Sequence, residues 1–161
     1  MLERDADALA ALVSPNVRLD FGGGGGVPEL RKRLADPDGK LWEALTNLVP
    51  LGCANLPAAA LTIPWYFPQN IPVDDPYMAM IVRGTDVPLL EKADANAKVV
   101  TRLSWDVVEL QANPADYAQV KTADGTTGYI EADKLRSLID YRLIADRGDD
   151  GWKIGALVAG D

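Results

Sequence analysis

The sequence contains no histidine and only one cysteine, and these two shortages exclude several classes of enzyme. Catalysis by a Ser-His-Asp or Cys-His arrangement needs an imidazole that this chain does not have. Zinc sites with histidine ligands, cysteine-cluster metal sites and internal disulfides are excluded on the same counts. Cys53 lies in the apolar stretch LVPLGCANL, which predicts a buried small side chain rather than a reactive thiol.

Long apolar runs and positive charge are also scarce. No run approaches the roughly 18 apolar residues of a membrane-spanning helix, so we predict no membrane span. The opening MLERDADALAALV lacks the basic region and the longer apolar core of a secretory signal, so we predict no signal peptide in this chain. The net charge is −8, from 16 basic and 24 acidic residues. An acidic surface repels phosphate backbones, so we predict no nucleic-acid partner.

The most conspicuous motif is FGGGGGVPELRKRL, five glycines that lead into an amphipathic segment. A phosphate-binding loop of the P-loop type ends in Gly-Lys-Ser or Gly-Lys-Thr. Here Gly26 is followed by Val27 and Pro28, and Pro28 has no N–H to offer a phosphate. A dinucleotide fingerprint needs a βαβ unit, and no second parallel strand follows. The motif predicts a connection from strand to helix, with a hinge as the alternative, and no nucleotide cofactor.

Acidic pairs are the remaining candidates for catalysis or metal binding. Asp36/Asp38, Asp74/Asp75 and Asp149/Asp150 are local pairs in turn-like stretches. Glycoside hydrolysis needs two carboxyl groups across a cleft, and a calcium loop needs a string of oxygen ligands with a closing glutamate. We interpret the pairs as turn and capping residues. The sequence therefore predicts no catalytic residue, no metal and no cofactor.

The pattern along the chain changes near Tyr77. Before it, apolar spacing favours helices, joined by a strand at 17–21 and an edge strand at 61–70. After it, short β-type runs alternate with turn residues, and ADGTTG at 123–128 predicts a hairpin centred on Asp124-Gly125. A last pair of runs around RGDDG predicts a C-terminal hairpin. We predict an α+β chain with a helical part at 1–76, a β-barrel at 77–136, and a hairpin at 137–161 that packs on the N-terminal part.

Residues 78–136 resemble the bacterial SH3-like domain, a small β-barrel. The segments VPLLEKADANAKVVTRL, SWDVVEL and YAQVKTADGTTGYIEADKL follow the order of the family pattern. The specific part is the second half, with Asp124-Gly125, Gly128-Tyr129-Ile130 and Leu135 at the family spacing. The first half departs from the pattern, since Leu90 stands where the family usually has arginine and Trp105 lies near a usual glycine.

This resemblance implies a non-enzymatic bacterial binding module. Members of the family are mostly found outside the cytoplasm, which implies a periplasmic location, and they bind peptides, proteins or cell-wall fragments. The cysteine peptidase that often accompanies the domain would need the histidine that this chain lacks.

The flanking segments resemble a second family. DALAALVSPNVRLDFGGGGGVPELRKRL is similar to the opening of nuclear-transport-factor-2-like α+β cone proteins, and DYRLIADRGDDGWKIGALVAGD is similar to their closing hairpin. This resemblance implies an alternative function, a small-molecule-binding cone that carries an inserted barrel. An enclosed cavity lined by Phe21, Trp42 and Trp152 would favour the cone, and an open groove on the barrel would favour the module.

Four aromatic residues are the predicted ligand contacts: Trp65, Tyr66, Trp105 and Tyr129. Trp65 and Tyr66 are neighbours between two prolines on the expected edge strand, where an extended peptide can add. Because neighbours on a strand point to opposite faces, we expect one of the two to be exposed. The alternative is that all four residues form an interface, either between the two halves of the chain or with a partner subunit.

Overall fold

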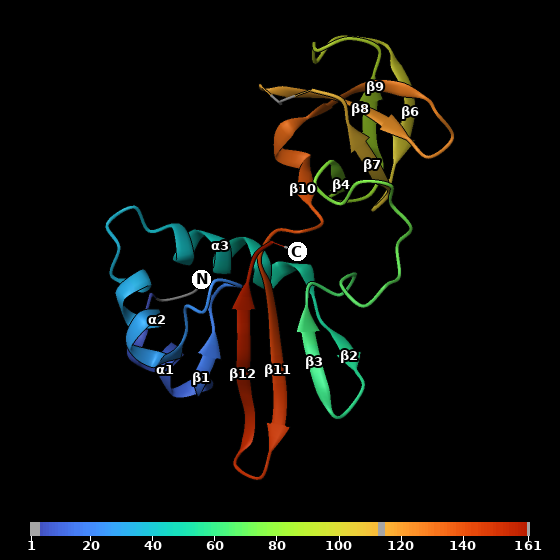
Figure 1. The fold of residues 1–161 in the computed structure, drawn as a ribbon. Helices are drawn as coiled ribbons and strands as arrows, with labels where there is room; N and C mark the ends of the chain where they lie inside the picture. The colour runs from blue at the N-terminus through green and yellow to red at the C-terminus, as the bar shows by residue number, and fades with distance from the viewer. Residues whose placement is uncertain (1–3, 113–114, 161) are drawn as a thin grey trace. The chain divides into compact units, whose positions relative to one another are not determined.

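The computed structural model describes residues 4–112 and 115–160, and the chain divides into two compact units. Unit 1 comprises Met1–Ile71 and Asp140–Asp161, and unit 2 comprises Pro72–Ile139. Unit 2 is thus inserted in the sequence of unit 1. Figure 1 shows the strands and helices of each unit.

The helices of unit 1 are short. They are α1 (Ala6–Leu12), α2 (Gly26–Leu34) and α3 (Lys40–Leu48), and α3 is followed by the 3₁₀ turn η1 (Val49–Leu51). Asp5 caps α1, because its Oδ1 accepts hydrogen bonds of 2.9 Å from the backbone N–H groups of Asp7 and Ala8. Along α3 the buried side chains recur at helical spacing and give the helix one apolar face: Leu41, Trp42, Leu45 and Leu48.

A five-stranded sheet completes unit 1. Its strands are β1 (Val13–Arg18), β2 (Ala54–Leu56), β3 (Ala60–Ile63), β11 (Arg142–Gly148) and β12 (Gly151–Val158). The order across the sheet is β1-β12-β11-β3-β2 (Figure 1). Strand β1 runs parallel to β12, and the other pairs are antiparallel. Segments from both ends of the chain therefore share one sheet.

Unit 2 contains a seven-stranded antiparallel sheet. Its strands are β4 (Ala79–Val82), β5 (Val87–Leu90), β6 (Val99–Leu103), β7 (Val107–Leu110), β8 (Tyr117–Thr122), β9 (Thr127–Glu131) and β10 (Leu135–Ser137). The 3₁₀ turn η2 (Ala132–Lys134) joins β9 to β10, and the strand order is β10-β4-β7-β8-β9-β5-β6. One face of the sheet buries the core: Val82, Val87, Leu89, Leu103, Val108, Leu110, Ala118, Val120 and Ile130.

Both hairpins expected from turn residues are present. Strands β8 and β9 pair from Tyr117–Glu131 to Lys121–Thr127, and Gly125 takes the left-handed conformation with φ of 87°. Strands β11 and β12 pair from Arg142–Val158 to Gly148–Gly151. Turn chemistry is a local property, so the turn residues of the sequence are sufficient to predict these pairs.

The predicted fold class is wrong. We expected an α+β chain with a helical part packed on an SH3-like barrel, and the structure is mostly β, with 39% strand, 20% helix and no closed barrel. The N-terminal part contributes three strands to a sheet whose other members come from the C-terminus. In unit 2 the end strands β10 and β6 pair only with β4 and β5 among the described residues. A barrel closes only when its end strands meet with matched tilt and stagger, which local patterns do not reveal.

The interpretation of Cys53 as a buried side chain is also wrong, since this cysteine is exposed. Gly52, with φ of 70°, ends η1, and Cys53 then leads into β2, the last strand at one edge of the sheet. Apolar neighbours in sequence do not cover a residue that enters an edge strand. In the described part of the chain, no helix combines the length and apolar character needed to cross a bilayer.

Candidate functional site

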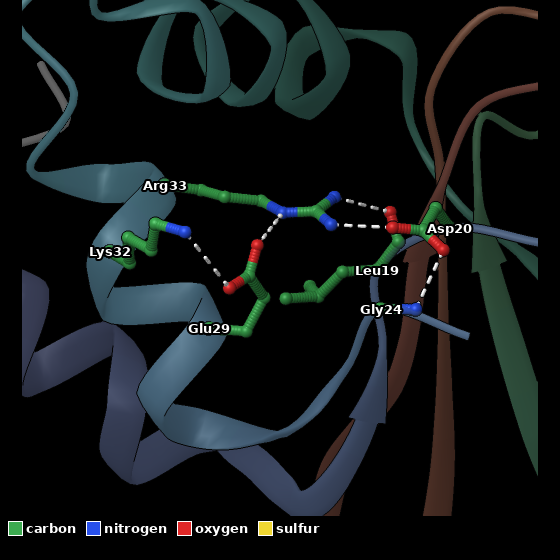
Figure 2. A network of polar contacts seen from close by, with 6 residues as sticks. All are labelled: Leu19, Asp20, Gly24, Glu29, Lys32 and Arg33. Atoms are coloured by element: carbon green, nitrogen blue, oxygen red, sulfur yellow. Dashed lines mark hydrogen bonds and ion pairs between the residues drawn. The ribbon is translucent and has the colours of Figure 1, made fainter. Parts of the chain in front are cut away.

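The glycine run folds back on the end of β1 and is held there by an acidic side chain (Figure 2). Asp20 Oδ1 accepts a hydrogen bond of 2.7 Å from the Gly24 N–H, and the Leu19 N–H donates to the Gly24 carbonyl at 2.9 Å. Arg33 of α2 donates from Nη2 to Asp20 Oδ2 at 2.5 Å and from Nε to Glu29 Oε1 at 2.9 Å. A third bond runs from Arg33 Nη1 to the Leu19 carbonyl at 3.0 Å.

These contacts change the acidity of both partners. The hydrogen bond from Arg33, followed by that from the Gly24 N–H, lowers the pKa of Asp20. The bonds to Asp20 and then to Glu29 raise the pKa of Arg33. The charged groups beside the glycine loop are thus engaged with one another. We interpret the loop as a structural connection rather than a phosphate cradle.

Trp65 and Tyr66 lie in a turn rather than on the predicted edge strand, because β3 ends at Ile63. The Phe67 N–H donates to the Pro64 carbonyl at 3.2 Å, which closes this turn. Trp65 is 37% exposed and Tyr66 is 3% exposed, so the expectation that one of them is exposed is confirmed. Their rings meet edge to face, with centroids 5.9 Å apart.

Two other aromatic residues of unit 1, Phe21 and Phe67, contact the side chain of Arg142. The guanidinium of Arg142 lies 4.9 Å from the ring centre of Phe67 and 5.5 Å from that of Phe21. Arg142 Nη1 also donates to the Gly160 carbonyl at 2.8 Å. The stack connects the loop after β1, the turn after β3 and the end of the chain, which is a structural role.

Trp105 and Tyr129 belong to unit 2, and the structure separates them. Trp105 lies in the turn between β6 and β7 with φ of 59°, and its N–H donates to the Gly84 carbonyl at 3.0 Å. Tyr129 pairs with Leu90, which pairs with Val99 at the first residue of β6. Trp105 follows Leu103, the last residue of that strand. The two aromatic residues therefore lie at opposite ends of the β5–β6 pair.

A hollow of about 250 Å³ lies on unit 2, around the β5–β6 pair. Residues paired across an antiparallel ladder point to the same face, as do alternate residues of one strand. The β5–β6 register shifts between Leu89 and Leu90, which interrupts the alternation along β6, and beyond the shift Val99 pairs with Leu90. Leu90 follows the core residue Leu89 and also pairs with Tyr129, so the side chains of Leu90, Val99 and Tyr129 lie on the face opposite the core. The hollow is lined by Val87, Pro88, Leu90, Ala95, Ala97, Val99, Arg102, Glu131 and Lys134.

A second hollow, of about 470 Å³, shares one residue with the first. Glu131 lines both, and Tyr117 pairs with Glu131 in the β8–β9 ladder. The second hollow is lined by Ala115, Asp116, Tyr117, Glu131, Ala132 and Asp133. Both hollows open to solvent, and we call the two together the outer-face groove.

The charges of the outer-face groove are unevenly compensated. Arg102 pairs with Asp86 at 3.3 Å, and Lys134 pairs with Asp133 at 3.5 Å. Within residues 4–112 and 115–160, neither Glu131 nor Asp116 forms a salt bridge. The pKa of Tyr117 is raised, first by partial burial and then by the negative charges of nearby carboxylates, Glu131 foremost. The second hollow is therefore acidic, and the first is mainly apolar.

None of the four predicted ligand residues lines either hollow, and Tyr129 is related to the outer-face groove only through its pairing with Leu90. Sequence reasoning missed Leu90, Val99, Tyr117 and Glu131. One signal was available in the run VPLL of β5, which is apolar at every position. A strand that is apolar on both faces indicates that its second face is also covered or used.

The described residues contain no group of three or more histidine, cysteine, aspartate or glutamate side chains arranged to hold a metal ion. Comparison with known proteins finds no matching family model, no matching curated protein and no matching solved structure.

Proposed function

We propose that the chain is a non-enzymatic binding module that holds an extended peptide segment of a partner protein in the outer-face groove of unit 2. The observation that carries the proposal is the mainly apolar hollow on unit 2, whose walls include Leu90 and Val99 on the face away from the core and one core residue, Val87. Val99, one of its lining residues, is 37% exposed, whereas Leu89 and Ile130 on the opposite face are fully buried. A hollowed apolar surface exposed to water is typical of an interaction site.

The dimensions of the groove favour a peptide. It crosses four neighbouring strands, β6, β5, β9 and β8, which span three intervals of about 4.8 Å, or roughly 14 Å. An extended chain advances about 3.3 Å per residue, so four or five residues cover this distance. Sites for small molecules enclose most of the ligand surface, whereas an open groove suits a chain that enters at one end and leaves at the other.

The alternative of a small-molecule-binding cone formed by unit 1 has less support. Trp42 is 6% exposed, and its Nε1 donates to the Leu34 carbonyl at 3.0 Å, so its ring belongs to the packed core. Phe21 and Trp152 are 51% and 44% exposed. These exposures do not suit three residues that line one enclosed cavity.

The resemblance to bacterial SH3-like domains is consistent with this proposal, and a periplasmic location is part of it. The closed barrel that this resemblance implied is not part of the proposal, because the sheet of unit 2 is open. The groove lies on a sheet face and does not depend on closure.

The test is selection from a phage-displayed library of random twelve-residue peptides. Cys53 is the single cysteine of the chain, is exposed and lines neither hollow, so a biotin attached there modifies no residue of the groove. We expect peptides to be enriched on the protein over a surface without it. Their affinity should fall at least about tenfold, or 1.4 kcal/mol, on Val99→Asp, because a charge replaces an apolar wall.

Val100→Asp is the matched control. Val100 is the next residue of β6, is 44% exposed and does not line either hollow, so the same change there should leave binding intact. Circular dichroism would verify that both variants fold. The absence of enriched peptides, or equal binding to the wild type and Val99→Asp, would overturn the proposal.

A further inference from the structure

We infer that the second hollow of the outer-face groove selects peptides with a basic residue, whose lysine or arginine side chain enters beside Tyr117 and between the carboxylates of Asp116 and Glu131. The inference rests on the proposed function and adds the chemical class of the peptide.

The backbone places the three residues together. Tyr117 and Glu131 are directly opposite in the β8–β9 ladder, so their Cβ atoms lie about 4.5–5.5 Å apart on one face. Asp116 immediately precedes Tyr117, and its carbonyl accepts a hydrogen bond of 2.9 Å from the Ala132 N–H, just past Glu131. The backbone thus holds Asp116 and Glu131 on adjacent strand ends.

The charge of this hollow is not neutralised from within. Asp133 has Lys134 as its partner, whereas the carboxylates of Glu131 and Asp116 have no salt bridge among residues 4–112 and 115–160. The cations at the first hollow do not neutralise these carboxylates, since Arg102 pairs with Asp86 and Lys134 pairs with Asp133. A basic side chain of a partner would provide the missing positive charge.

Tyr117 suits the apolar part of such a side chain. Its ring is half-buried, and burial together with the negative charges of Glu131, Asp94 and Asp116 raises the pKa of its hydroxyl. Lysine and arginine have long aliphatic stems that pack on apolar surface while the charged head reaches polar groups. A cation beside an aromatic ring is also attracted by the negative face of the ring.

The geometry also predicts the spacing within the peptide. The first hollow centres on the β5–β6 pair and the second on the β8–β9 pair, two strand intervals away, which is about 10 Å. The second lies a further two residues along β9, from Tyr129 to Glu131, which is about 7 Å. The combined separation is about 12 Å, so the basic residue should be three or four positions from the apolar residue that occupies the first hollow.

Nucleic acids and anionic lipids carry negative charge, which the acidic second hollow repels.

The experiment repeats the phage selection on three proteins: the wild type, the double variant Asp116→Asn/Glu131→Gln, and the matched control Glu109→Gln. Glu109 lines neither hollow and pairs with Lys121 at 3.5 Å on β7 and β8, so the control removes one carboxylate of unit 2 away from the groove. We expect peptides selected on the wild type and the control to carry an excess of lysine and arginine, three or four positions from an apolar residue. On the double variant this excess should disappear, while peptides with the apolar residue are still enriched.

A pair of synthetic peptides then measures the effect directly. The best wild-type peptide and its version with glutamine in place of the basic residue should differ at least about tenfold in affinity for the wild type. They should bind equally to the double variant. Enrichment without a basic residue, or a basic preference that persists in the double variant, overturns this inference and leaves the proposed function standing. The absence of enrichment on all three proteins overturns the proposed function itself.

Discussion

Asp20 shows how a single residue closes an otherwise unrestrained stretch of backbone. Five glycines in a row carry a large entropy cost of ordering, so a loop made of them needs specific contacts to keep one conformation. Asp20 provides two of these contacts, through the Gly24 N–H and the Arg33 guanidinium. Folding and side-chain ionisation are therefore coupled at this position.

The first prediction concerns pH. Because the pKa of Asp20 lies below its ordinary value of 3.8 in the folded chain, its ionised form stabilises the fold. That contribution is fully present above the unfolded pKa, and it is lost as the pH falls through the lower, folded pKa. A carboxyl ¹³C titration should give Asp20 a midpoint below 3.8 in the wild type and a higher midpoint in Arg33→Met.

Lys32→Met is the control for this titration, because Lys32 pairs only with Glu29, at 3.9 Å, among the salt bridges of the described residues. It should leave the Asp20 midpoint in place. A wild-type midpoint at or above 3.8 would contradict the assigned role of Arg33.

The second prediction compares two glycines of the same run. A methyl group at Gly25 would lie 2.6 Å from the Val17 carbonyl oxygen, and a backbone atom in a strand has little room to move. At Gly22 the nearest atom would be Asp20 Oδ1 at 3.5 Å, an ordinary contact. We expect Gly25→Ala to lower the free energy of unfolding by about 1–3 kcal/mol and Gly22→Ala to change it by less than about 0.5 kcal/mol in urea unfolding. Equal changes in the free energy of unfolding for the two variants would show that the glycine run is flexible and that Gly25 is not packed against β1.

At the scale of elements, the contact between β9 and β5 joins the core of unit 2 to the outer-face groove. Strand β5 presents Leu89 to the core and Leu90 to the groove, and it meets β9 at the Leu90–Tyr129 pair. Gly128 precedes Tyr129, and the absence of a side chain there permits the close approach of the two strands.

The third prediction is that Gly128→Ala weakens both unit 2 and the groove. The added methyl group would lie 2.6 Å from Leu89 Cγ and 2.8 Å from the Leu90 carbonyl oxygen, so β9 has to move away from β5. We expect a loss of about 1–3 kcal/mol in the free energy of unfolding, together with weaker binding of the selected peptides.

The neighbouring substitution Thr127→Ala is the matched control, because Thr127 is exposed on the same strand. It should change stability by less than about 0.5 kcal/mol. If Gly128→Ala has no more effect than Thr127→Ala, the close approach of β9 to β5 has no energetic role.

For the whole molecule, the main feature is the insertion of unit 2 between two neighbouring strands of unit 1. Strands β3 and β11 pair directly, from Ile63–Leu143 to Ala60–Asp146, although unit 2 separates them in sequence. Each unit has its own sheet and its own buried residues, so each has the features of an independent folding unit.

The fourth prediction is that the two units fold separately. A chain in which a short glycine-serine linker replaces Pro72–Ile139 should keep the unit 1 sheet, because β3 and β11 are antiparallel neighbours that a short connection can join. The excised Pro72–Ile139 segment should also fold. Thermal unfolding followed by circular dichroism should show one cooperative transition for each, and a fragment without such a transition would contradict independent folding.

The sequence by itself determined the features that depend on neighbouring residues. The hairpin at Asp124-Gly125 and the terminal hairpin around RGDDG follow from turn chemistry. One of Trp65 and Tyr66 is exposed as expected, although the two residues lie in a turn and not on the strand from which the expectation was argued. Only the tertiary structure decided which strands share a sheet. The parallel pairing of β1 with β12 joins residues from opposite ends of the chain, and no local pattern encodes a partner that far away.

The same reason explains why the candidate site was found only in the structure. Leu90, Tyr117, Val99 and Glu131 lie on four different strands, and their common face is set by the register of the ladders between those strands. A shift of one residue in any ladder would turn a strand's side chains to the other face. Register depends on the packing of the whole unit, so it is a property of the tertiary structure rather than of any single segment.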